Sequence, residues 1–134
     1  MRGRARIRDR AGRERGQAMV EFVIVLPILC VLLFGIVQFG ITFNHYLTLT
    51  DSVRAGARKA AVSREASDPV GAAVAQVRAS ASDLKQSDLS VTITSSWSPG
   101  GDVTVTARYP YSINIMGVVV HSGQLKSSTT ERVE

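Results

Sequence analysis

The sequence predicts an α+β protein built from a long N-terminal helix, a second helix and a small antiparallel sheet. Residues 22–43 form an apolar run without a charged side chain, long enough for a helix that crosses a membrane. Residues 70–84 carry apolar side chains at helical spacing. Residues 89–109 contain two segments in which apolar and polar side chains alternate, separated by a turn sequence, and this pattern indicates a hairpin.

The first 16 residues carry the whole net charge of the chain. They contain seven arginines against Asp9 and Glu14, a sum of +5, which equals the +5 of all 134 residues. A nucleic-acid-binding arm can have this composition. A basic segment directly before a membrane span is better explained by the excess of Lys and Arg in cytoplasmic flanks. We therefore expect residues 1–16 to be a cytoplasmic leader, the C-terminal part to lie outside the cytoplasm, and no nucleic acid to be bound directly.

Residues 17–43 are predicted to form the transmembrane helix. At 1.5 Å per residue, the uncharged part from Phe22 to Phe43 would be roughly 33 Å long, about the thickness of the hydrocarbon core of a bilayer. Gln38 is its only strongly polar side chain, and Pro27 can kink the helix. Cys30 is expected to be an apolar core residue. Because it is the single cysteine, it cannot form an internal disulfide, and the fold does not depend on one.

A carboxylate lies at the start of this apolar helix. Glu21 is costly beside lipid unless a positive charge pairs with it. Gly16 precedes it by five residues and directly follows the arginine-rich leader. An ordinary signal anchor would fit if Glu21 lay at the level of the lipid headgroups.

The same residues resemble the prepilin signal, in which a membrane peptidase cuts after a glycine and a glutamate is the fifth residue of the mature chain. The resemblance implies cleavage between Gly16 and Gln17. It also implies that Glu21 pairs with the new α-ammonium group of Gln17, within one chain or between neighbouring subunits.

Helical signals continue past Phe43 without a breaker, so we expect the first helix to run from about Met19 to about Val62. Small residues near its C-terminal end would let another helix approach closely, and they are Ala55, Gly56, Ala57, Ala60 and Ala61.

Residues 15–62 as a whole resemble the TadE-type minor pilins, or pseudopilins, of the tight-adherence (Tad, or Flp) pilus system. The matching segments are RGQAMVEF at 15–22, LPIL at 26–29 and DSVRAGARKAA at 51–61. The resemblance implies a pilin-like fold. It also implies other Tad pilins, the pilus platform in the inner membrane, the prepilin peptidase and the secretion ATPase as partners. Beyond residue 62 it is only architectural.

Residues 44–134 are expected to form an extracytoplasmic α+β domain. Asp68 and Pro69 are typical of a helix start. The apolar stripe of the helix that follows is expected to pack on the sheet rather than on a partner, and it consists of Val70, Val74, Val77, Ala81 and Leu84. Alternation predicts strands over residues 89–97 and 103–109 and a weaker strand over residues 124–133.

The segment between the second and third predicted strands, residues 110–120, is too apolar for a solvated loop. It either covers the core or forms an exposed contact surface. We favour core cover, because so small a domain needs every apolar residue for its core.

No catalytic or metal-binding motif is present. The two histidines, His45 and His121, have no partner at a metal-ligand spacing, and the chain lacks G-x-S-x-G, P-loop and G-x-G-x-x-G patterns. We expect no enzyme activity, no cofactor or metal, and no small-molecule substrate.

The residues and the resemblance together favour a minor pilin or pseudopilin of a Tad-type, type IVb-like pilus. It would be a single-pass protein of the bacterial inner membrane with its N-terminus in the cytoplasm, and would act in pilus assembly or at the pilus tip. Adhesion or DNA uptake would be the use of the pilus. The alternative is an uncleaved single-pass membrane protein whose outer domain binds a partner.

Overall fold

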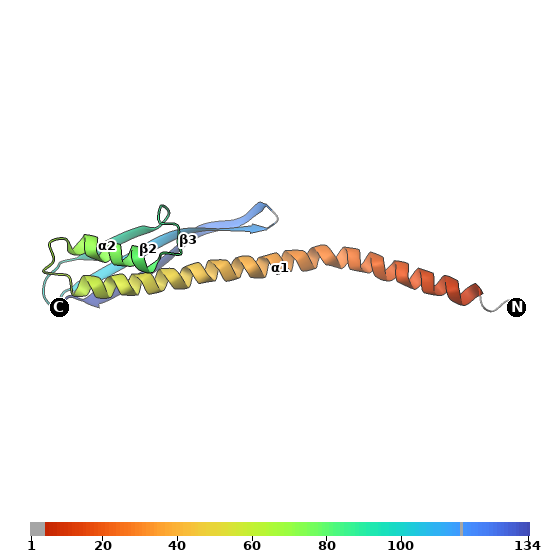
Figure 1. Cartoon of the computed structure of the whole chain (residues 1–134), viewed down its shortest axis with the longest axis horizontal. Coiled ribbons are helices and arrows are strands. Elements are labelled where there is room, and N and C mark those ends of the chain that lie inside the picture. Colours follow the sequence, from red (N-terminus) through yellow and green to blue (C-terminus); the bar gives the residue numbers. More distant parts are fainter. Residues whose placement is uncertain (1–4, 116) are drawn as a thin grey trace. The chain divides into compact units, whose positions relative to one another are not determined.

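The computed structural model describes the backbone of residues 5–115 and 117–134 and the side chains of residues 16–115 and 117–134. The elements follow the order α1, α2, β1, β2, β3 (Figure 1). The predicted α+β class is confirmed. The chain divides into an N-terminal unit that ends at Val37 and a C-terminal unit, Gln38–Glu134, and each is described by itself.

Helix α1 extends over Ala5–Ala61. Its end agrees with the expected end near Val62, but it begins well before Met19. Arginine and alanine are strong helix formers, so the arginine-rich sequence prolongs the helix instead of interrupting it. At the other end, Arg58 and Lys59 lie in the last turn, where positive charge is favourable beside the helix dipole.

Helix α2 extends over Pro69–Ser80 and starts as the sequence predicts. Asp68 is the N-cap residue, and its Oδ1 accepts a hydrogen bond of 2.8 Å from the backbone N–H of Gly71. Of the expected stripe, Val77, Ala81 and Leu84 are buried, whereas Val70 is exposed and its place in the core is taken by Ala73.

The three strands form one antiparallel sheet in the order β1-β2-β3. They are β1 (Ser90–Ser95), β2 (Asp102–Ile115) and β3 (Val118–Arg132). Val103, Val105 and Ala107 of β2 point into the core, and the alternate residues face outward. On the outer face hydroxyl groups pair across β2 and β3, at 2.8 Å between Thr104 and Thr130 and 2.9 Å between Thr106 and Ser128.

The expectation that residues 110–120 cover the core is wrong. Residues 110–115 continue β2, residues 118–120 begin β3, and the two strands pair in a long hairpin that turns at Gly117, whose φ is 87°. Figure 1 shows this hairpin extending beyond β1 and α2. The ladder shifts register between Ile113 and Asn114, and Val118, Val119 and Val120 are exposed. Backbone pairing with the opposite strand, not burial, therefore holds this segment in place.

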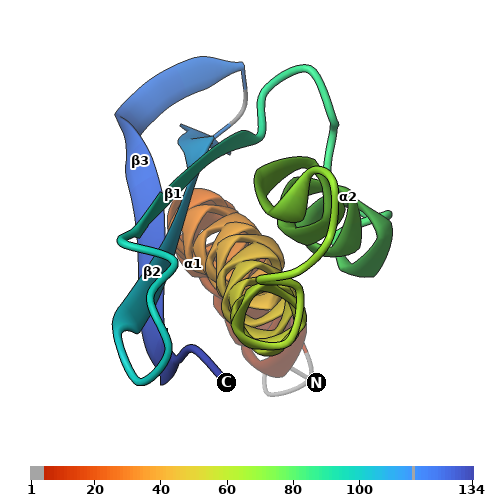
Figure 2. The same ribbon diagram turned by 90° about the vertical axis from the view of Figure 1, so that its left-hand side faces the viewer.

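The core of the C-terminal unit lies where α1, α2 and the sheet meet, and Figure 2 shows these elements end-on around the same stretch of α1. Leu49 and Val53 of α1, Val77 of α2 and Val105 of β2 are fully buried in one cluster. The end of β3 closes this unit. Val133 is buried, and the backbone N–H of Glu134 donates a hydrogen bond of 3.1 Å to the carbonyl of Ala61 at the end of α1.

Candidate functional site

The predicted processing segment lies on an open surface of α1. Gly16, Gln17 and Glu21 are all exposed, and no atom would contact a Cβ placed on Gly16. The side-chain amide of Gln17 donates a hydrogen bond of 3.1 Å to Oε1 of Glu21, one helical turn away. The structure thus places together the two residues that the prepilin resemblance pairs, here through the side chain of Gln17.

The peptide bond between Gly16 and Gln17 is part of a helix. A peptide bond inside a helix is held by the hydrogen bonds of its own turn, so the chain must become locally extended before a peptidase can cut it. Glycine lowers the cost of this opening, because it is about 1 kcal/mol less favourable than alanine inside a helix. An exposed, weakly helical glycine next to a glutamine is therefore a chemically suitable place to cut.

The part of α1 that follows Glu21 exposes apolar side chains on every face. Phe22, Val23 and Ile28, which point in different directions around the helix, are each more than 55% exposed. By length and composition, Gly16–Ala61 contains the one helix among the described residues that could cross a membrane. An apolar surface of this extent in water would drive association, so it requires lipid or other helices as surroundings.

The predicted helix–helix contact residues lie near the C-terminal end of α1, away from Gly16 and Glu21. Gly56, Ala57, Ala60 and Ala61 are buried, and Ala55 is half-buried. A Cβ built on Gly56 would overlap the side chain of Val77, so α2 occupies the close approach that this glycine allows. Within the described chain, the helix that packs on these small residues is therefore α2.

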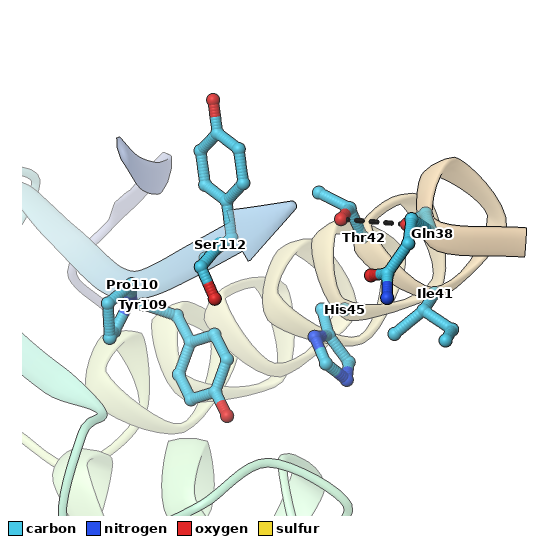
Figure 3. A pocket seen from close by; sticks show the side chains of 8 residues that line it. Gln38, Ile41, Thr42, His45, Tyr109, Pro110 and Ser112 are labelled. Atoms are coloured by element: carbon cyan, nitrogen blue, oxygen red, sulfur yellow. Dashed lines mark hydrogen bonds between the residues drawn. The ribbon is translucent and has the colours of Figure 1, made fainter. Parts of the chain in front are cut away.

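A second cluster lies where α1 meets the middle of β2 (Figure 3). The rings of His45 and Tyr109 meet edge to face, with their centroids 5.5 Å apart. The hydroxyl of Tyr109 accepts a hydrogen bond of 3.3 Å from the backbone N–H of Lys85, beyond the end of α2. Beside this contact, Gln38, Ile41 and Thr42 line a pocket of about 200 Å³ together with Pro110, Tyr111 and Ser112.

The contact between Tyr109 and His45 was not predicted from the sequence. The alternation over residues 103–109 predicts that Tyr109 faces the core, but it does not identify His45 as its neighbour. The pairing of a tyrosine with a histidine 64 positions earlier depends on how the strand crosses the helix, and no local pattern contains that information. The pocket is smaller than the sites of about 300–1,000 Å³ that hold small molecules.

Among the described residues outside the apolar helix, the carboxyl group of Asp88 has a shifted pKa. Hydrogen bonding from Ser87 lowers the pKa of the Asp88 carboxyl, and the nearby Lys85 ammonium lowers it further. The Ser87 hydroxyl donates at 2.9 Å, and the Lys85 nitrogen is 3.3 Å from Asp88. These contacts at the surface stabilise the turn formed by residues 85–88. In the described part of the chain, no three His, Cys, Asp or Glu residues come together as metal ligands.

Comparison with known proteins gives one match. The model of the family described as "TadE-like protein" matches residues 16–58, which are 43 of the 134 residues. The match begins at Gly16, contains Glu21 and the apolar run, and ends within the small-residue segment of α1. No curated protein and no solved structure is matched by this chain. The resemblance predicted for the N-terminal helix is confirmed. The members of this family are pilus components, and it is not an enzyme family.

Proposed function

We propose that this chain, TadE-like over residues 16–58, is a minor pilin or pseudopilin of a tight-adherence pilus. It is inserted in the bacterial inner membrane with its N-terminus in the cytoplasm. The prepilin peptidase removes residues 1–16, and the remaining helix assembles with those of sibling Tad pilins on the pilus platform. The C-terminal unit then lies outside the cytoplasm, and the pilus serves adhesion or DNA uptake.

One observation carries this proposal: an exposed glycine and an exposed glutamate lie directly before the part of α1 that is apolar on all sides. The helix alone would fit any single-pass protein, but Glu21 is then a charge that lipid penalises. A charged side chain at the bilayer centre costs about 2.5–3.5 kcal/mol on insertion scales. Cleavage after Gly16 creates an α-ammonium group four residues from Glu21, and this group offsets the cost.

In the uncleaved chain, the neutral amide of Gln17 is the partner of Glu21. An amide satisfies one oxygen of the carboxylate but leaves its charge in place, whereas an ammonium group neutralises it. Cleavage therefore converts a weak local contact into a charge pair. If the ammonium of one subunit meets the carboxylate of the next, the pair also sets the axial register between their helices.

Intact mass tests the processing step. Expressed in a host with a Tad prepilin peptidase, the protein should lose residues 1–16 and begin at Gln17. Gly16→Trp should retain the leader, because a bulky side chain blocks the approach of the peptidase to the backbone. Gly35→Trp is the matched control, since Gly35 is a second open glycine in the same helix, and it should be cut normally. An uncut parent chain, or a cut Gly16→Trp chain, would favour the uncleaved single-pass alternative.

Co-purification with sibling pilins tests the assembly step. Glu21→Ala should be inserted and cleaved as before, because removing a charge eases insertion, but it should lose its sibling pilins. Asp51→Ala removes a carboxylate that is exposed on the same helix beyond the apolar run, and it should keep them. Equal recovery of siblings by both variants would mean that Glu21 is only a headgroup-level residue.

A further inference from the structure

The outer face of the sheet, which is the side turned away from α2 and from the part of α1 in the C-terminal unit, carries a regular set of hydroxyl groups. Figure 2 shows both helices on the same side of the sheet. The hydroxyl groups lie in two rows across the three strands, and we call them the hydroxyl array. In register, one row consists of Thr92, Thr106 and Ser128, and the next row consists of Thr94, Thr104 and Thr130.

The sheet sets the dimensions of the hydroxyl array. Neighbouring strands are about 4.8 Å apart, and successive outward residues on one strand are about 6.8 Å apart, so the array covers roughly 10 Å by 7 Å. All six side chains are exposed or half-buried. Polar side chains and threonine methyl groups thus form an open surface on one face of the three strands.

Much of the hydrogen-bonding capacity of the hydroxyl array is free. The hydroxyls of Thr104 and Thr130 bond each other, as do those of Thr106 and Ser128. Each pair uses one O–H, because one hydroxyl donates and the other accepts. Among the described residues, the side chains of the two β1 threonines have no hydrogen-bond partner. The array therefore offers one O–H from each pair and two from β1 to a ligand.

The charge at the two borders of the hydroxyl array differs. At the border toward the hairpin end, Arg108 lies directly opposite Lys126, and like charges facing each other across a ladder are unfavourable. Both are exposed, and in the described part of the chain neither forms an ion pair. At the other border Arg132 faces Asp102. The face therefore has a net positive charge concentrated at one border, which is complementary to an anionic partner.

The residue types on this face indicate the class of that partner. The outward positions from Ser90 to Thr94, Asp102 to Arg108 and Lys126 to Arg132 hold only Ser, Thr, Asp, Arg and Lys. Protein interfaces depend on aromatic and other large anchors in buried pockets, and contact with lipid needs apolar side chains. Single-stranded nucleic acids bind on aromatic stacking platforms. A chain of acidic sugars carries closely spaced hydroxyls and carboxylates, and it requires none of these features.

We propose that the hydroxyl array and the Arg108–Lys126 pair bind an acidic polysaccharide, a polymer that contains hexuronic acid units. The array exchanges hydrogen bonds with the sugar hydroxyls, and the threonine methyl groups lie against the C–H faces of the rings. The two cations pair with sugar carboxylates. The inference rests on the proposed function only in that the C-terminal unit lies outside the cytoplasm, and it assigns a chemical partner to adhesion. The surface lies outside the family match, which covers residues 16–58.

Methyl NMR of the full-length chain in phosphatidylcholine nanodiscs tests the proposal. The threonine methyl groups are labelled with carbon-13, and oligogalacturonate is added. Signals are read at single residues because the arginine-rich residues 1–16 also attract polyanions. We expect saturable shifts at Thr94, Thr104 and Thr130 and none at Thr129, which lies opposite the buried Val105 on the inner face. No shift within the array, or equal shifts at Thr129, would overturn the proposal.

Two other probes separate sugar recognition from simple charge attraction. Polyphosphate has charge without sugar hydroxyls, and a maltooligosaccharide has sugar hydroxyls without charge. At the array, both should bind roughly tenfold more weakly than oligogalacturonate, because each lacks one kind of contact. Equal binding of polyphosphate would identify a general polyanion surface, such as one for nucleic acid. Equal binding of the maltooligosaccharide would contradict an acidic ligand.

Hydroxyl removal supplies a further measurement. Thr92→Val with Thr94→Val deletes two free hydroxyls and keeps β-branched side chains in the strand. This change should weaken the binding of oligogalacturonate, read at the Thr104 methyl, by roughly tenfold. Thr129→Val is the matched control on the inner face and should bind as the parent does. Parent-like binding by the double variant would contradict the role of the array, and the titration of the parent chain decides the matter if the variant does not fold.

Charge removal tests the cation pair. Arg108→Gln with Lys126→Gln should weaken the binding of oligogalacturonate several-fold and leave that of the maltooligosaccharide unchanged. Arg58→Gln with Lys59→Gln removes the same charge from the exposed last turn of α1 and should change neither. Equal losses in both double variants would show that net charge alone drives binding. These readouts do not involve cleavage or sibling pilins, so their failure would leave the proposed pilin function intact.

Discussion

The two units of this chain use the same helix in opposite ways. In the N-terminal unit, α1 exposes its apolar side chains in all directions, and Leu32 is 59% exposed. In the C-terminal unit, α1 buries one face completely, and Leu49 is 0% exposed because α2 and the sheet cover it. A helix gains tertiary stability only where an apolar face meets a partner. The described part of the N-terminal unit therefore depends on lipid or other helices around it, whereas the C-terminal unit buries a core of its own.

Truncating one leucine in each unit is expected to give the largest difference in unfolding free energy between the two units. Leu49→Ala should destabilise the C-terminal unit by about 2–5 kcal/mol, through lost burial and the cavity that remains. Leu32→Ala should change the same unfolding free energy by less than about 0.5 kcal/mol. Urea unfolding in detergent micelles, followed by the fluorescence of the single tryptophan, Trp97, measures both. Equal effects would break the distinction between the two units.

A smaller effect is expected from glycine replacement. Gly56→Leu should cost about 1–3 kcal/mol, because the added side chain overlaps Val77 and pushes α2 away from α1. Gly35→Leu should not destabilise the C-terminal unit, since no atom lies within 4 Å of a Cβ at that position. Adding Val77→Ala should recover part of the loss in the Gly56→Leu chain. A double-mutant cycle from unfolding curves measures this coupling, and a coupling near zero would contradict the predicted contact.

The smallest effect concerns pH. The pKa of Asp88 is lowered in the folded chain, first by Ser87 and then by Lys85. The contribution to stability is therefore present above the ordinary carboxyl pKa of 3.8 and is lost as the pH falls through the lower, folded value. Ser87→Ala should raise the pKa of Asp88 toward 3.8, which an NMR titration of the carboxyl carbon can follow. An unchanged titration would show that the hydroxyl does not stabilise this charge.

Much of this architecture could be predicted from local signals. The end of α1 and the start of α2 follow from residue types whose preferences act within one turn, such as Asp68 and Pro69. The hairpin between β1 and β2 follows from strict alternation. The candidate site at Gly16 and Glu21 was also visible, because it depends on spacing along a single helix.

Other features depend on contacts between distant residues. The small residues around Gly56 predicted a close helix, but only the three-dimensional arrangement identifies it as α2. The outer hairpin was misread, because Val118 to Val120 looked like core residues although strand pairing alone explains them. The alternation of Tyr111, Ile113 and Ile115 with polar residues, followed by Gly117, was a usable signal for the longer strand. The beginning of α1 at Ala5 was missed because a change of charge was taken for a change of structure.

The closure of the C-terminal unit on α1 has a mechanical consequence. Two contacts flank the core along α1: Tyr109 of β2 lies against His45, and Glu134, beyond the end of β3, donates a hydrogen bond to Ala61 and accepts one of 3.0 Å from Arg64. These places are 16 helical residues apart, or roughly 24 Å at 1.5 Å per residue. An axial pull on α1 loads both attachments in shear at the same moment instead of peeling them one after the other. The sheet is therefore expected to move together with residues 45–61 of α1 instead of detaching from one end first.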